Sequence, residues 1–182
     1  MLQRFKIPMS KTKNISADKT WEFCHKWLFR TSDLPPSPPP SSSYTFDKAQ
    51  KEDMSFIRSR IAIYRTEDTL LRIPSVVIRS EKGDGKPIAW AFMGLDGTLM
   101  SLHVEEEYRR RGLAKVIACR VMGGHVGDYG DDGWGAADVV VSNEKSQGVC
   151  RSVGGRVWWT LSWGILDLSG LDEEEGGVEG DI

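Results

Sequence analysis

The 182-residue chain has few cysteines, few histidines and no long apolar run. Its three cysteines, at positions 24, 119 and 150, are an odd number without metal-ligand spacing, which excludes a disulfide framework and a clustered zinc site. No stretch is apolar over the ~20 residues that a membrane-spanning helix needs. The N-terminus lacks the apolar core of a secretion signal. The sequence therefore predicts a protein of a reducing, cytoplasmic compartment, with no metal and no membrane partner.

Charge is nearly balanced overall but is unevenly distributed. The net charge of −2 predicts no general attraction to nucleic acid. We expect residues 1–43 to be a basic N-terminal segment with a short helix over Thr20–Arg30 and a proline-rich linker. Residues 44–168 are expected to form the folded domain, and residues 169–182 an acidic disordered tail. The helix prediction rests on the helical spacing of Trp21, Cys24 and Trp27.

The periodicity of the domain alternates between helix and strand. Thr66 is a plausible helix cap, Asp96-Gly97 separates two β-type runs as in a hairpin, and Gly123-Gly124 should end a helix. This order predicts an α/β fold with a mixed sheet. The predicted helices cover residues 47–57, 66–72, 112–122 and 144–153, and the predicted strands cover residues 76–78, 88–93, 99–104, 137–141 and 157–168.

The most informative stretch runs from Val104 to Ala114, where a strand leads through an acidic bend into three arginines, a glycine and a helix. A helix N-terminus carries unpaired N–H groups and partial positive charge, so it attracts anions. Gly112 lets a bulky anion approach the backbone because it has no Cβ. The arginines add charge suited to phosphate. This stretch favours pyrophosphate binding, although a basic, solvated helix start that binds nothing has the same residues.

Arg109-x-x-Gly112-x-Ala114 resembles the phosphate-binding signature of the GNAT-type N-acetyltransferases, and the resemblance covers about residues 65–168. Among its branches, the chain looks most like the glycine N-acyltransferase-like proteins, by Trp90, Asp96-Gly97, Leu102-His103-Val104 and Trp163. The resemblance implies a mixed, mostly antiparallel central sheet flanked by helices, and acetyl-CoA or another acyl-CoA as co-substrate. The residues it implies for CoA binding are Leu102, His103, Val104, Arg109, Arg110, Arg111, Gly112, Leu113, Ala114, Asn143 and Ser146.

Two positions depart from the family pattern. The family's Tyr, which acts as the acid that protonates the departing sulfur, is replaced by Cys150, and a following Phe is replaced by Gly155. Cys150 is a candidate acid, although inert buried cysteine is commoner. His103 is a candidate base, or a hydrogen-bonded structural histidine. Glu105, Glu106 and Asp96 are other candidate bases.

The resemblance implies a CoA-dependent N-acyltransferase that transfers an acyl group directly to the amine of a small molecule or amino acid. Three alternatives remain open: a protein or peptide N-acetyltransferase on the same fold, a degenerate CoA-binding protein without activity, and a nucleic-acid binder that uses Arg109, Arg110 and Arg111. The last is disfavoured because no aromatic residues are interleaved with the basic ones. The oligomeric state does not follow from the sequence.

Overall fold

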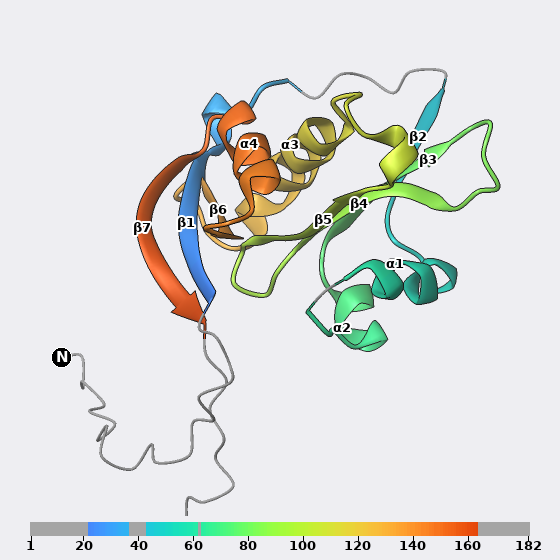
Figure 1. The fold of residues 1–182 in the computed structure, drawn as a ribbon, viewed down its shortest axis with the longest axis horizontal. Coiled ribbons are helices and arrows are strands. Elements are labelled where there is room, and N and C mark those ends of the chain that lie inside the picture. The colour runs from blue at the N-terminus through green and yellow to red at the C-terminus, as the bar shows by residue number, and fades with distance from the viewer. Residues whose placement is uncertain (1–21, 37–42, 62, 164–182) are drawn as a thin grey trace, which may run out of the picture.

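The computed structural model describes residues 22–36, 43–61 and 63–163, which form two antiparallel sheets (Figure 1). The four-stranded sheet has the order β2-β3-β4-β5, and the three-stranded sheet has the order β6-β1-β7. A parallel bridge between Thr98 and Ala136 joins the two sheets. The strands are β1 (Glu22–Arg30), β2 (Tyr44–Asp47), β3 (Ser75–Ser80), β4 (Pro87–Met93), β5 (Leu99–Val104), β6 (Trp134–Val140) and β7 (Arg156–Trp163).

The described helices are α1 (Met54–Arg60), α2 (Glu67–Arg72), α3 (Leu113–His125) and α4 (Glu144–Ser152). The first three cover the two faces of the four-stranded sheet, and α4 packs against α3 and β6. In Figure 1, α3 lies on one face of this sheet and α1 and α2 lie on the other. β4 is buried along its whole length, and its side chains alternate between two cores. Ala89 and Ala91 join the core under α3, while Trp90 and Phe92 join the core under α1 and α2.

The α1 face is fixed to the sheet by a buried ion pair. Both carboxylate oxygens of Asp53, which directly precedes α1, accept hydrogen bonds from the Arg79 guanidinium of β3, at 2.9 and 2.7 Å. Asp53 is only 6% exposed. Its Oδ2 also accepts from the backbone N–H of Gln50. This pairing, led by the hydrogen bond from Arg79 to Asp53, raises the pKa of the guanidinium despite its burial. The start of α1 is therefore held by a two-bond contact to β3.

Most of the predicted order is confirmed. From residue 75 onward the elements follow as strand, strand, strand, helix, strand, helix, strand, within an α/β fold whose sheets are mostly antiparallel. The Thr66 hydroxyl accepts from the backbone N–H of Thr69 and caps α2 as predicted. Gly97 lies at φ = 74° in the β4–β5 hairpin, a conformation that glycine adopts without steric cost.

The helix predicted over Thr20–Arg30 is wrong, because the described part of this segment, Glu22–Arg30, is strand β1. β1 pairs with β6 on one side and with β7 on the other, so it is the central strand of its sheet. Cys24 and Trp27 are both buried although strand geometry puts them on opposite faces. Two buried residues three positions apart imitate the spacing of a helix. We therefore propose that the folded domain begins at or before residue 22, and not at residue 44.

The predicted end of α3 at Gly123-Gly124 is also wrong, because the helix continues to His125. Met122 and Val126, one helical turn apart, are both buried. Their packing offsets the cost of glycine inside a helix, about 1 kcal/mol each.

The acidic tail and residues 37–42 of the proline-rich stretch lie outside the described residues. In the part of the chain that the structure describes, no helix combines the length and apolar character needed to cross a membrane.

Candidate active site

The segment from β5 to α3 presents an uncapped helix N-terminus to solvent. A short 3₁₀ turn, Glu106–Tyr108, follows β5, and Gly112 is the N-cap residue that directly precedes α3. No side chain caps the helix there. The first-turn N–H groups of Leu113 and Ala114 point out of the helix N-terminus, where no carbonyl oxygen of the helix can reach them. These donors, together with the partial positive charge of the 13-residue helix, suit an anionic ligand.

Gly112 is required by its backbone, and the space beside it is open. Its φ is 78° and its ψ is 0°, a left-handed conformation that disfavours any residue with a Cβ. A Cβ built at this position would meet no atom within 4 Å. Arg110 is also left-handed, at φ = 62°. The turn is therefore held in an unusual shape that leaves room for a ligand at the start of α3.

The three arginines of the turn have different environments. Arg109 donates to the backbone carbonyl of Val104 at 3.0 Å. Arg111 donates to the carbonyl of Glu107 at 3.0 Å and lies over the Tyr108 ring. These two side chains brace the turn. Arg110 is exposed and forms no hydrogen bond or ion pair with any residue that the structure describes. Its guanidinium is the one most available to a phosphate.

β5 contains a bulge just before this turn. In the register with β4, Trp90 pairs with His103 and Phe92 pairs with Met100, so Ser101 and Leu102 both lie opposite Ala91. Ser101 has a left-handed φ of 51°. A bulge leaves one of two adjacent residues out of the hydrogen-bond ladder. Backbone polar groups at Ser101 and Leu102 are therefore available at the position where the resemblance places the acyl carbonyl. Leu102 and Val104 pack against the core under α3.

Asn143 and Ser146 form the start of α4. The Asn143 side-chain oxygen accepts from the backbone N–H of Ser146 at 3.0 Å, which is an N-cap. The structural role that the sequence allowed for Asn143 is thus present. Asn143 is exposed and Ser146 is half-buried, so a contact with a bound pantetheine arm remains a prediction.

Cys150 is a buried thiol with weak acidity. It is 4% exposed and belongs to the core under α3. Burial raises the pKa of the Cys150 thiol to about 12. An ordinary thiol has a pKa of about 8.5, so Cys150 is a poorer proton donor than an unperturbed thiol. The geometry and acidity both favour a packing role.

Phe29 of β1 explains the second departure from the family pattern. Gly155 is buried, and a Cβ at this position would overlap the Phe29 ring. The backbone N–H of Gly155 also donates to the Cys150 carbonyl at 2.9 Å. An aromatic ring from the N-terminal strand thus occupies the space that a side chain at residue 155 would need.

On the opposite face of β5, His103 belongs to an ordered polar cluster. The Glu105 Oε1 atom lies 3.1 Å from His103 Nε2 and 3.1 Å from Arg60 Nε. The His103 ring stacks on Trp90, with 4.5 Å between ring centroids. Glu105 was one of several candidate bases in the sequence. The sequence analysis did not single out Arg60, because it lies 45 positions before Glu105 and only the fold brings the two side chains together.

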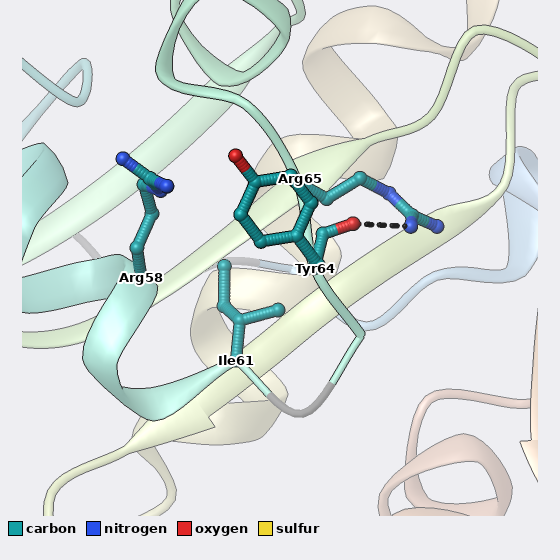
Figure 2. A pocket seen from close by; sticks show the side chains of 4 residues that line it. All are labelled: Arg58, Ile61, Tyr64 and Arg65. Carbon is teal, nitrogen blue, oxygen red and sulfur yellow. Dashed lines mark hydrogen bonds between the residues drawn. The ribbon is translucent and has the colours of Figure 1, made fainter.

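A hollow lies where α1 meets the loop that leads to α2. It has a volume of about 270 Å³ and is lined by Arg58, Ile61, Tyr64 and Arg65. Figure 2 shows the Arg58 side chain and the exposed Tyr64 ring beside each other, with Arg65 extending from the other side of the loop. Arg65 donates to the Tyr64 carbonyl, and neither arginine pairs with a carboxylate among the described residues. The hollow is therefore electropositive.

The comparisons agree on the fold. The FR47-like protein family model matches residues 76–164. A Drosophila protein superposes with a TM-score of 0.70 at 18% identity, over 79% of this chain and 50% of that one. A GCN5-related N-acetyltransferase from Kribbella flavida gives 0.57 at 18% identity, over 79% and 58%. No curated protein sequence matches the chain.

A third similar structure contains bound CoA. It is an aminoglycoside N-acetyltransferase in complex with CoA, with a TM-score of 0.51, 17% identity and coverage of 71% of this chain and 96% of that one. The chain thus spans only about half of the first two similar structures but nearly all of this smaller one. The described residues have the fold of the GCN5-related N-acetyltransferases.

Proposed function

We propose that the chain is an N-acyltransferase that uses acetyl-CoA or another acyl-CoA. The observation that carries the proposal is the turn Arg109–Ala114, where the uncapped start of α3, the left-handed Gly112 with open space beside it and the exposed Arg110 coincide. Helix N-H donors and a guanidinium together recognise a pyrophosphate. The likeness to the N-acetyltransferase fold supports the same assignment.

The chain's residues supply two kinds of support for acyl transfer. Arg110 and the first turn of α3 would hold the pyrophosphate, with Arg109 and Arg111 bracing the turn. Backbone groups at the β5 bulge would lie beside the acyl carbonyl and stabilise the oxyanion that forms there. Leu102 and Val104 would line the pantetheine arm, and Asn143 and Ser146 would donate to it. Acyl-CoA brings the thioester, whose sulfur is a good leaving group.

For the acceptor, we propose the amine of a small molecule or an amino acid, and a place in the glycine N-acyltransferase-like branch. The electropositive hollow of Arg58 and Arg65 supports an acceptor that carries a carboxylate, because a guanidinium binds carboxylate in a planar, two-bond geometry. A cytoplasmic location fits the three buried thiols, Cys24, Cys119 and Cys150.

Calorimetric titration with CoA tests the binding site. Arg110→Gln should weaken the affinity for CoA about tenfold, because it removes a charged hydrogen-bond donor to the pyrophosphate. The variant should still fold, because the Arg110 side chain is exposed. Arg72→Gln is the control, because Arg72 forms an exposed ion pair with Asp68 on α2. Equal affinity for CoA in both variants would contradict the assignment.

A thiol-release assay with acetyl-CoA tests the reaction and the acceptor class. Pairs of amines that differ only in a carboxylate, such as glycine and glycinamide, should be distinguished by the parent protein in favour of the acid. Replacing Arg58 and Arg65 with glutamine should reduce this preference. Absence of thiol release with every amine tested, in a protein that binds CoA in the titration, would contradict the proposed acyl transfer.

A further inference from the structure

His103 has a defined hydrogen-bonding state. Its Nε2 lies 3.1 Å from Glu105 Oε1, and the same oxygen accepts from Arg60 Nε at 3.1 Å. An ionised carboxylate can only accept. Nε2 must therefore carry the hydrogen. In a neutral ring, Nδ1 is then left with its lone pair, and no residue within the described ranges bonds to it.

The surroundings of His103 keep its ring neutral. Burial lowers the pKa of His103, Glu105 acts in the opposite direction, and the positive charges of Arg109 and Arg60 lower it further. These three charged side chains are the ones that act on the ring, since the face packed against Trp90 carries no charge. The imidazole is 23% exposed, and in its neutral form the Nδ1 lone pair can accept a proton from an acceptor amine.

The position of His103 connects the two halves of the site. It directly follows Leu102 in the bulge, where the acyl carbonyl is proposed to bind. Its side chain is on the opposite face from Leu102, the face that carries α1 and the electropositive hollow. A base at this point would lie beside the proposed position of the thioester, on the sheet face from which the acceptor amine is proposed to approach.

We propose that His103 is the general base of the acyl transfer and that Arg60 and Glu105 are positioning residues that hold its ring in the tautomer with a free Nδ1. The proposal rests on the proposed N-acyltransferase function. The arrangement matches a base whose second nitrogen is oriented by a carboxylate. Arg60 adds a further contact to this arrangement, because it donates a hydrogen bond to the Glu105 carboxylate from α1.

The proton balance is complete without any further reactant. The acceptor arrives as an ammonium, and one of its protons passes to His103 Nδ1. The neutral amine nitrogen then forms a bond to the acyl carbon, and the carbon–sulfur bond breaks as the tetrahedral species collapses. The second proton of the nitrogen neutralises the released thiolate through solvent, and the imidazolium returns its proton to solvent. Glu105 stabilises the imidazolium in the interval.

A purely structural role for this cluster predicts a different outcome. Arg60 and Glu105 also link α1 to the end of β5, so their loss could reduce stability alone. A structural link would lower the melting temperature and leave the pH profile unchanged. The proposed role moves the acidic limb of kcat/KM, and it moves it in opposite directions in the two variants.

The first experiment is a pH profile of kcat/KM for four proteins. Glu105→Gln removes the carboxylate that raises the pKa of His103, so the acidic limb should move to lower pH, with a loss in kcat. Arg60→Gln keeps a donor for Glu105 but removes a charge that lowers this pKa, so the limb should move to higher pH. His103→Gln should lose about a hundredfold or more in kcat. Arg72→Gln, on the exposed face of α2, should match the parent.

Nitrogen NMR of histidine-labelled protein provides a test that does not depend on turnover. The chain has three histidines, so the His103 signals can be assigned with the His103→Gln variant. The expected result is a neutral ring at pH 7 with hydrogen on Nε2. Hydrogen on Nδ1, or unmoved acidic limbs in both glutamine variants, would overturn the proposal. CoA titration separates the two failures: a parent protein that binds no CoA contradicts the proposed function, whereas His103→Gln that binds CoA and turns over at the parent rate contradicts only the base.

Discussion

At the scale of the residue, Gly112 is the position on which the proposed CoA binding depends most directly. Gly112→Ala should abolish measurable binding in calorimetry, because a Cβ would enter the open space beside the helix start and strain a backbone at φ = 78°. Gly85→Ala is a matched control, since Gly85 has φ = 80° and equally open surroundings in the β3–β4 turn. Both variants should lose about 1 kcal/mol of stability, but only the first should lose CoA. Equal binding by both would remove Gly112 from the site.

Replacement of Cys150, unlike that of Gly112, should leave the protein functional. Cys150→Ala should keep kcat within about a hundredfold of the parent, because a buried thiol with a pKa near 12 is a weak proton donor and the thioester has a good leaving group. The measurement is thiol release at saturating acetyl-CoA, with circular dichroism as the check on folding. A loss of several thousandfold in a folded variant would assign the acid to Cys150.

The local geometry of the candidate site was predictable where its residues follow one another in the chain. The sequence predicts a helix that begins at the glycine of Arg109-x-x-Gly112-x-Ala114, and the structure has α3 beginning directly after Gly112. The binding of an anion there stays a prediction. It does not identify Arg60, whose contact with Glu105 spans 45 positions and follows only from the packing of α1 on the sheet. It also does not predict that Phe29 fills the space beside Gly155.

At the scale of the element, α1 is held in place from its first turn. Asp53→Asn should destabilise the protein by about 3 kcal/mol, because it leaves the Arg79 guanidinium of β3 without its buried anionic partner. Chemical denaturation measures the change. Asp68→Asn is the control, since Asp68 pairs with Arg72 where both side chains are more than 70% exposed, and such pairs contribute less than about 1 kcal/mol. Similar losses of stability in the two variants would show that the buried Asp53–Arg79 pair stabilises the protein no more than the exposed Asp68–Arg72 pair does.

Elements were predicted well when a local turn or cap signal marked their ends. β4 and β5 were found within one residue, and α2 within one residue at its start, because a hairpin signal and a cap marked their ends. β1 was mistaken for a helix because its partner strands are distant in the sequence and leave no hairpin signal beside it, while the buried Cys24 and Trp27 lie three positions apart, as in a helix. Tertiary packing at Met122 and Val126 likewise outweighed the local signal of Gly123 and Gly124 in α3.

At the scale of the whole molecule, β1 joins the N-terminal part of the chain to the second sheet. Removal of residues 1–43 should therefore abolish the cooperative unfolding transition and CoA binding, because β6 and β7 lose the strand that pairs with both. Point variants within β1 provide a finer measurement by denaturation. Trp27→Ala, which empties a buried site, should cost about 3–5 kcal/mol. Phe23→Ala, at a side chain 59% exposed, should change stability by less than about 0.5 kcal/mol. A stable fragment beginning at Tyr44 would restore the domain boundary that the sequence predicts.

The place of β1 also determines when this protein can fold during its synthesis. Its partner strand β7 is among the last described elements to leave the ribosome, and the contact between His25 and Thr160 spans 135 positions. The four-stranded sheet can form on the emerging chain, since its strands are consecutive. β1 cannot pair with β6 and β7 until nearly the whole described domain has been translated, and Trp27 and Phe29 stay exposed until then. High contact order of this kind slows folding, and it leaves an unpaired strand with exposed apolar side chains in the nascent chain. Slower translation of residues 134–163 would therefore lengthen the exposure of β1 and increase the yield of aggregated product.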